Sequence, residues 1–286
     1  DGEYARRTLQ TEQLFPVIDL RTSLRLRLTP ASFLDAKQGA GSWLAPITAE
    51  TVLRLEEKSQ TEKESDIYLL RFSKFQNDST TILGNGTMQQ DLNLFENNPE
   101  YSFRLRWAQR KGLTKLFNAT ERSGSTERSL RARWQPTFDV GLQLDLAGNG
   151  SSLRTTETAS TRAFDLTTLS AASDLSYRPT NSLEVGWRLK VSTNEDRLLA
   201  TPRNTTISTN ELRGLYSIET NGRLRAELER TVVTSQNIPS GDIYSLPYQL
   251  TDGYVIGPTW VARLTFEYRV SSNVQLSITY TGRAQP

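Results

Sequence analysis

Few residues of this 286-residue chain have the type and spacing that catalysis needs. The chain contains no Cys and no His, which excludes thiol nucleophiles, disulfides, imidazole metal ligands and histidine-based general acid–base chemistry. The glycines of Gly39-Ala40-Gly41 and Gly84-Asn85-Gly86 lack the spacing of nucleotide-binding loops. Carboxylates that are adjacent in sequence would point to opposite faces of a strand and could not share a substrate. We therefore predict that the chain is not an enzyme and holds no cofactor or metal ion.

The charge of the chain is nearly balanced. Lys plus Arg number 34 and Asp plus Glu number 32, which gives a formal net charge of +2. A surface dedicated to nucleic acid needs a larger basic excess, so we expect no nucleic-acid partner. Mean hydropathy is -0.52, and no run approaches the roughly 18 apolar residues of a membrane-spanning helix. A membrane β-strand escapes that test, because only every second residue meets lipid.

The charged residues follow a period of two along apolar segments. Arg104 and Arg106, for example, alternate with Phe103, Leu105 and Trp107. This period places the charged side chains on one face of a strand and the apolar ones on the other. In a barrel with lipid outside, the charged face lines the lumen, where acid–base pairs either brace a filled interior or line a water channel. The candidate lumen-facing residues are Arg104, Arg106, Arg131, Arg133, Asp139, Asp145, Glu184, Arg188, Lys190, Arg225, Glu227 and Glu229.

The clearest elements are four hairpins in the second half of the chain. In the last hairpin, apolar residues fill every second position from Trp260 to Val270 and from Val274 to Tyr280, with turn residues between them. The three earlier hairpins have turns at residues 135–137, 178–182 and 219–222. Similar alternation in the first half marks strands around residues 24–28, 51–55 and 101–107. We expect about twelve antiparallel strands, an even number that suits a barrel.

The connections between these strands alternate in length. Tight turns join the strands within each hairpin, whereas long polar segments at Gly148–Arg162, Thr193–Thr206 and Thr234–Pro258 join one hairpin to the next. Short turns at one end and long loops at the other are typical of outer-membrane barrels, whose turns are periplasmic and whose loops are extracellular. Residues 31–46 are a candidate for a short helical or plug-like insert.

Strand length and aromatic placement also favour a membrane protein. A tilted strand crosses a bilayer in about 9 to 11 residues, and Phe138–Leu146 and Trp260–Val270 fit that length. Aromatic rings beside the tight turns predict a girdle at the lipid headgroups, although aromatic residues also favour strands in general. The candidate girdle residues are Trp134, Phe138, Tyr177 and Tyr268.

Three segments carry a resemblance to a known family. They are LPYQLTDGYVIGPTWVARLTFEYRVSSNVQLSITYTGR, YLLRFSKFQNDSTT and RPTNSLEVGWRLKV. Together they resemble the C-terminal region of large uncharacterised outer-membrane β-barrel proteins from Bacteroidota and Chlorobi-type bacteria. The resemblance covers most of the chain and implies a location but no activity. Such proteins continue beyond the Tyr-x-Gly-Arg motif into a final aromatic strand, and no signal peptide opens this sequence, so we expect a mature chain or an excerpt.

These observations predict an all-β, antiparallel, up-and-down transmembrane β-barrel over residues 1–286, or the C-terminal part of a larger barrel. We expect it in the bacterial outer membrane, in contact with the lipid bilayer and with other outer-membrane or periplasmic subunits as potential partners. The first functional hypothesis is a structural, pore, transport or translocon role with a charged lumen. The alternative is a non-enzymatic surface assembly or adhesion protein whose loops bind a partner chain or glycan. A soluble β-sheet module is the third hypothesis.

Overall fold

A computed structural model describes most of the chain. The described residues are 18–30, 46–59, 81–116, 119–156, 163–198, 203–218, 221–236, 248–271 and 274–285. The predicted insert at residues 31–46 therefore lies outside them, except for Pro46. No helix within these ranges is long and apolar enough to span a membrane.

Twelve strands and one short helix make up the described residues. The strands are β1 (Ile18–Leu28), β2 (Ile47–Ser59), β3 (Thr81–Leu94), β4 (Tyr101–Lys115), β5 (Thr120–Thr137), β6 (Val140–Thr155), β7 (Phe164–Thr180), β8 (Leu183–Asp196), β9 (Arg203–Ile218), β10 (Gly222–Gln236), β11 (Gly257–Ser271) and β12 (Val274–Ala284). The helix is α2 (Tyr248–Thr251). The predicted all-β architecture and the predicted number of strands are confirmed.

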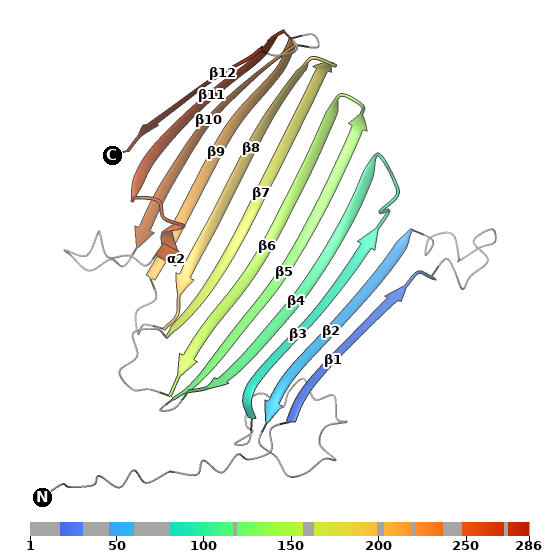
Figure 1. Cartoon of the computed structure of the whole chain (residues 1–286), viewed down its shortest axis with the longest axis vertical. Helices are drawn as coiled ribbons and strands as arrows, with labels where there is room; N and C mark the ends of the chain where they lie inside the picture. The colour runs from blue at the N-terminus through green and yellow to red at the C-terminus, as the bar shows by residue number, and fades with distance from the viewer. Residues whose placement is uncertain are drawn as a thin grey trace, which may run out of the picture.

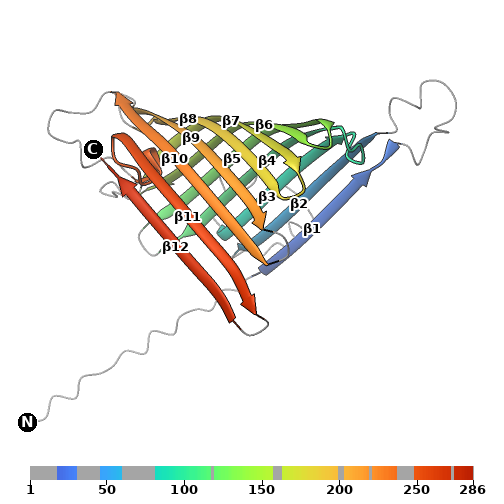
Figure 2. The same ribbon diagram turned by 90° about the horizontal axis from the view of Figure 1, so that it is seen from above.

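The strands form a single sheet in chain order, from β1 to β12. Every neighbouring pair is antiparallel, so the chain is an up-and-down meander, as predicted. The sheet is curved like a trough and its two edges lie apart (Figures 1 and 2). Within the described residues, β1 and β12 each pair with one strand only, so these twelve strands form an open wall rather than a closed barrel.

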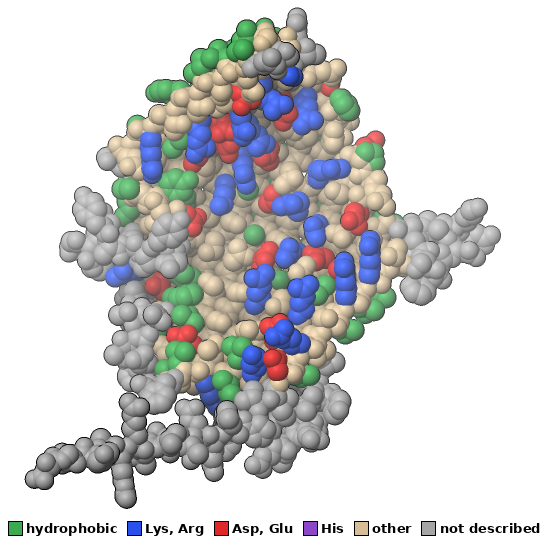
Figure 3. Space-filling model, in the orientation of Figure 1, with side chains coloured by type: hydrophobic (Ala, Val, Ile, Leu, Met, Phe, Trp, Pro, Cys, Tyr) green, Lys and Arg blue, Asp and Glu red, His purple; other side chains and the backbone are tan. Residues whose placement is uncertain are grey.

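The two faces of the sheet have opposite chemistry, because the register keeps like residues aligned from strand to strand. Leu105, Leu130 and Leu146 lie directly opposite one another on β4, β5 and β6. Alternation then places the charged residues, such as Arg131 and its partner Asp145, on the other face. By register the concave face carries most of the charged strand residues, and Figure 3 shows Lys, Arg, Asp and Glu side chains spread over it. The large apolar side chains project from the convex face and stay exposed, Leu146 to 51%, for example.

The sheet has a turn end and a loop end. The turn end holds the tight connections at residues 95–100, 138–139, 181–182, 219–221 and 272–273. The loop end holds the connections at residues 60–80, 116–119, 156–163, 197–202 and 237–256. Two connections depart from the predicted asymmetry. Leu116 donates its N–H to the Ala119 carbonyl in a tight connection at the loop end (2.8 Å), and residues 29–46 form a long one at the turn end.

The strands are longer than predicted, at 11 to 18 residues. Several residues predicted in loops extend β6, β8 and β9, so the connections there are shorter than expected. Two turn positions also differ from the prediction. The strand register shifts after Trp134 and again after Tyr177, and these irregularities accommodate Pro136 and Pro179 near the strand ends.

This shift corrects the placement of two predicted site residues. Phe138 and Asp139 form the turn between β5 and β6 instead of starting the next strand. Asp139 therefore does not belong to the charged face of a strand, and its carbonyl accepts a hydrogen bond from the Arg178 N–H (2.7 Å). The physical reason is that Pro136 ends the regular ladder without ending the strand.

Candidate functional site: the charged concave face

The concave face brings together most of the predicted charged residues. Apart from Asp139, all of them lie on this face by strand register. Their orientation toward a lumen stays a prediction, because these strands do not close. The face holds a ladder of ion pairs that runs from β1 to β11, beginning with Arg25 and Glu50 at 2.7 Å.

A first network links β3 to β6. Arg131 on β5 donates to Asp145, its register partner on β6, at 2.6 Å. Arg106 lies 3.8 Å from Glu127, and Arg104 lies 3.5 Å from Asp91. Asp91 and Glu127 are site residues that the sequence did not indicate.

Asp91 is the least exposed acid of this network, with its side chain 6% exposed. It accepts a hydrogen bond of 2.5 Å from Gln89, and the side-chain carbonyl of Gln89 accepts a longer one of 3.4 Å from Arg106. A buried carboxylate needs such partners, because burial of an unpaired charge is costly. The network therefore fixes the side chains of β3 against those of β4.

A second network spans three strands, because a glycine leaves room for it. Arg213 on β9 reaches across β8 to donate to Asp174 on β7, at 2.6 Å. Gly186 lies between them, and a Cβ there would meet the Arg213 side chain within 2.8 Å. A larger residue at Gly186 would close this passage. The sequence analysis missed both Arg213 and Asp174, although both continue the period of two.

A third cluster surrounds Glu227 on β10. Arg225 approaches it at 2.5 Å along the same strand, and Arg263 on β11 approaches it at 3.4 Å. Two of these three residues were predicted, and Arg263 was not. Glu184, another predicted residue, pairs with Arg178 beside the β7–β8 turn at 3.1 Å. Arg133 donates to a backbone oxygen, that of Pro99.

Residues 248–256, which precede β11, fold onto the concave face at the loop end. Their helix α2 lies over β8 and β9 (Figure 1), and Leu250 of that helix is fully buried. The Asn194 side chain donates to the Leu250 carbonyl at 2.8 Å. The chain then turns through Asp252 and Gly253, both with positive φ, before β11 begins. We call residues 248–256 the inward loop.

Tyr254 anchors the inward loop to the concave face of β10. Its hydroxyl donates to Glu229 at 3.0 Å, and Thr231 donates to the same carboxylate oxygen at 3.0 Å. Burial raises the pKa of the Tyr254 hydroxyl above its ordinary value of 10.0, and the hydrogen bond to Glu229 raises this pKa further. The phenol is therefore held neutral as a hydrogen-bond donor.

A small hollow of about 220 Å³ separates the inward loop from the strands. Arg188 and Lys190 line one part of it, and Glu211, Glu229 and Asp252 supply carboxylates. Cations and anions thus face each other across a polar space. Within the described residues, no group of three or more acidic side chains is positioned to hold a metal ion.

The predicted girdle residues lie at the turn end of the sheet. Trp134, Tyr177 and Tyr268 project from the convex face, and Phe138 is 80% exposed in its turn. Tyr101 lies directly opposite Trp134 and was missed by the sequence analysis. Their function as a girdle at the lipid headgroups stays a prediction.

Comparisons with known proteins add little to this picture. No protein-family model and no curated protein matches the sequence. Among solved structures, the chain is similar to OmpT, an outer membrane protein of Vibrio cholerae in its trimer form, at 9% identity over 94% of this chain and 88% of that chain, with a TM-score of 0.39. It is also similar to the alcaligin outer membrane receptor FauA of Bordetella pertussis, at 12% identity over 92% of this chain and 52% of that chain, with a TM-score of 0.39.

A third similar structure is the translocator domain of the autotransporter NalP of Neisseria meningitidis. The identity is 11% over 94% of this chain and 82% of that chain, with a TM-score of 0.27. At such identities and TM-scores these similarities bear on neither function nor substrate.

Proposed function

We propose that this chain forms part of the wall of a bacterial outer-membrane β-barrel with more than twelve strands, whose charged concave face lines a polar lumen. The role is structural or transport-related, as a pore or translocon barrel. The observation that carries the proposal is the segregation of the two faces, which the register maintains across all twelve strands. An exposed apolar face of this size would aggregate in water and is satisfied by lipid.

The barrel needs more strands because of the pairing of β1 and β12. Each pairs on one side only within the described residues. An unpaired strand edge in lipid leaves N–H and C=O groups without partners, at several kcal/mol for each group, so membrane sheets close. The resemblance to large outer-membrane barrels of Bacteroidota and Chlorobi-type bacteria supports the same size class. The alternative adhesion function depends on the long loops, most of which lie outside the described residues.

A polar lumen, as opposed to a filled one, is supported by the small ion-lined hollow under the inward loop. The test is the ion selectivity of the protein in planar bilayers. Neutralisation of Arg188 and Lys190 to Gln is expected to shift the reversal potential in a salt gradient toward cation selectivity, because it removes positive charge from the lumen. Arg230→Gln is a control at the convex face, where Arg230 lies over the Trp260 ring, and its loss of one charge should leave the reversal potential unchanged.

Three outcomes separate the possibilities. A shift with the first variant alone supports a conducting lumen behind the concave face. No conductance from protein that has inserted would refute the pore and leave a structural barrel. Failure of the protein to co-fractionate with outer membranes would refute the location itself.

A further inference from the structure

The hollow under the inward loop differs from its surroundings in how its charges are paired. Elsewhere on the concave face, two ion pairs have a length of only 2.6 Å. The charged residues that line the hollow are Arg188, Lys190, Glu211, Glu229 and Asp252. Within the described residues, none of these five takes part in an ion pair. The hollow therefore holds two cations and three carboxylates that stand apart around one space.

The strand register contributes to this separation of charges. Arg188 lies opposite Asp174 on β7 and opposite Glu211 on β9. Asp174 is occupied by Arg213, which donates to it at 2.6 Å. Lys190 lies opposite an uncharged residue on each neighbouring strand. The donors of both cations are therefore not taken up by carboxylates of the described residues.

Two carboxylates of the hollow repel each other. Glu211 and Glu229 lie directly opposite each other on β9 and β10, and like charges at such positions are destabilising. The hydrogen bonds from Tyr254 and Thr231 to Glu229 come from neutral hydroxyls, and both use the same oxygen, Oε1. Glu211 accepts no hydrogen bond within the described residues. An ammonium group between the two side chains would relieve the repulsion, because it offers three donors to the carboxylate oxygens.

A buried hydroxyl on β8 also lacks a partner. Ser192 is 3% exposed, and its hydroxyl oxygen makes no hydrogen bond within the described residues. It lines the same hollow, two residues along β8 from Lys190 and on the same face of the sheet. Burial of a hydroxyl without a partner is costly, so a polar ligand at this side of the hollow would stabilise it. The hydroxyl and the two cations are all donors on β8, which suits a carboxylate.

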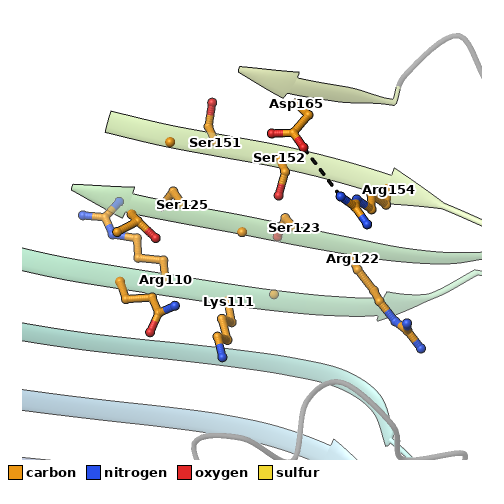
Figure 4. Close-up of a pocket in the computed structure, with 14 residues that line it drawn as sticks. Arg110, Lys111, Arg122, Ser123, Ser125, Ser151, Ser152, Arg154 and Asp165 are labelled. Atoms are coloured by element: carbon orange, nitrogen blue, oxygen red, sulfur yellow. Dashed lines mark ion pairs between the residues drawn. The ribbon is translucent and has the colours of Figure 1, made fainter. Parts of the chain in front are cut away.

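A larger hollow on the convex face shows that a basic lining alone does not define a binding site. It has a volume of about 490 Å³, and Lys111, Arg122 and Arg154 are among its lining residues. The ends of these three side chains point apart (Figure 4), and Arg154 pairs with Asp165 at 3.5 Å. They therefore do not address a common ligand. The hollow under the inward loop is smaller, and its charges of both signs line one space.

The size and charge spacing of the hollow under the inward loop suit an α-amino acid. Its volume of about 220 Å³ lies below the roughly 300 to 1,000 Å³ of pockets for drug-sized ligands, so a smaller ligand fits. Lys190 and Glu211 occupy diagonal positions of β8 and β9, about 7 to 8 Å apart. An α-amino acid holds its amino nitrogen about 2.5 Å from its carboxyl carbon, and charge-assisted hydrogen bonds of about 2.8 Å at both ends extend this to about 8 Å. Such a ligand thus spans the distance between the cation and the carboxylate.

We propose that the hollow under the inward loop binds one small zwitterion of the α-amino-acid class. Its carboxylate accepts from Arg188, Lys190 and Ser192, and its ammonium group donates to Glu211 and Glu229. An anion alone would be repelled by the two glutamates, and a cation alone would be repelled by the two basic side chains. The proposal rests on the proposed polar lumen, which is the aqueous route to the concave face, and it names the class of solute that this lumen binds.

The test measures ligand binding to the full chain purified in a neutral detergent. Isothermal titration calorimetry with L-alanine as the probe gives the dissociation constant. Propionate and ethylamine are the matched ligands, since propionate lacks the ammonium group of L-alanine and ethylamine lacks its carboxylate. The variants are Lys190→Gln, Glu211→Gln and Ser192→Ala. Glu56→Gln is the control, because it removes from β2 a concave-face carboxylate that lies outside the hollow and, within the described residues, has no ion pair.

L-Alanine should bind more tightly than either propionate or ethylamine. Lys190→Gln and Glu211→Gln should each weaken the binding of L-alanine about tenfold, the lower end for a hydrogen bond to a charged group. Lys190→Gln should not weaken ethylamine and Glu211→Gln should not weaken propionate, because each change removes a charge that repels that ligand. Ser192→Ala should weaken L-alanine without loss of stability, because the hydroxyl that it removes has no partner within the described residues. Glu56→Gln should bind L-alanine as the parent protein does.

Three results would overturn the proposal. Equal affinities for the three ligands would show that the hollow does not recognise a zwitterion. Equal loss of L-alanine binding in Glu211→Gln and Glu56→Gln would show a general charge effect. No L-alanine binding by protein that conducts ions in planar bilayers would refute the site and leave the proposed function standing. Failure of the parent protein to insert into membranes would instead refute the proposed function, and the titration in detergent would still decide whether the site exists.

Discussion

A charge at the centre of the convex face should destabilise the protein in lipid, and Leu264 marks that centre on β11. On the loop-end side of Leu264, Trp260 lies four residues away along β11. On the turn-end side, Tyr268 lies four residues away. Four residues of a strand span about 13 Å, or about 10 Å along the membrane normal at a tilt of about 40°. The two rings are then about 20 Å apart, close to the roughly 25 Å of a barrel's apolar band. Leu264→Arg therefore places a guanidinium near the midplane.

The expected cost is about 2 to 4 kcal/mol, which is roughly 30-fold to 1,000-fold in the folding equilibrium. Urea titration of the protein folded into phosphatidylcholine vesicles would measure it. The matched control is Thr265→Arg, one residue along on the concave face between Arg263 and Glu267. We expect the control to change stability by less than about 1 kcal/mol, because its charge stays in water. Equal losses for the two variants would show that the faces are not divided between lipid and water.

Three further predictions concern the concave face and the two ends of the sheet. Gly186→Val should displace Arg213 from Asp174 and lower the free energy of unfolding by about 1 kcal/mol. Adding Arg213→Gln should cause no further loss, and additive losses in urea titration would contradict this. The pKa of Tyr254 is raised above 10.0, so the neutral phenol should stabilise the inward loop below pH 10, and this contribution should be lost as the pH rises through the folded-state pKa. Tyr254→Phe should abolish that pH dependence of the stability, and the ultraviolet absorbance of the phenolate would follow the ionisation. In intact cells Leu198→Cys should react with an impermeant maleimide while Asn181→Cys reacts only after the outer membrane is opened, and the reverse pattern would invert the orientation.

The sequence predicted the hairpins best where one face must be apolar. In the last hairpin the apolar alternation predicted strands at Trp260–Val270 and Val274–Tyr280, and β11 and β12 contain both. The signal is strong there because a face that meets lipid tolerates few polar side chains. Outside the apolar band that requirement disappears, so the Ser-rich and Thr-rich strand extensions at the loop end looked like loops.

Strand β3 was missed for the same reason. Its convex positions mix the apolar Met88, Leu92 and Leu94 with Gly84, Gly86 and Gln90, which are small or polar, so the apolar period of the segment is interrupted. The omission of β3 also hid Asp91, whose carboxylate is among the most buried of the concave face. A strand whose apolar period is interrupted is detectable only through its neighbours in the sheet.

The charged face was predictable, but its pairing was not. A period of two assigns a side chain to a face, whereas its partner depends on the register and on the space between strands. Arg131 and Asp145 belong to one hairpin, but the predicted turn at residues 135–137 would place Arg131 opposite Gly141, so even this pairing depends on the observed turn at residues 138–139. Arg213 and Asp174 are separated by a whole strand, and their contact depends on Gly186, whose significance is invisible in the sequence.

The two edges of the sheet, β1 and β12, are the reason for proposing a barrel of more than twelve strands. β12 presents Leu276, Ile278 and Tyr280 on the convex face, and its backbone pairs only with β11 within the described residues. The side chains of such an edge suit lipid, but its free N–H and C=O groups do not, because lipid offers them no partner. β1 has the same property at the opposite edge, where Leu24 and Leu26 are exposed and Arg25 already belongs to the ion ladder. Both faces therefore continue unchanged to both edges, and strands added there would extend the apolar surface and the charged surface together. Since β1 and β12 are separated by an even number of strands in an antiparallel meander, an even number of added strands would close the ring with antiparallel pairs throughout.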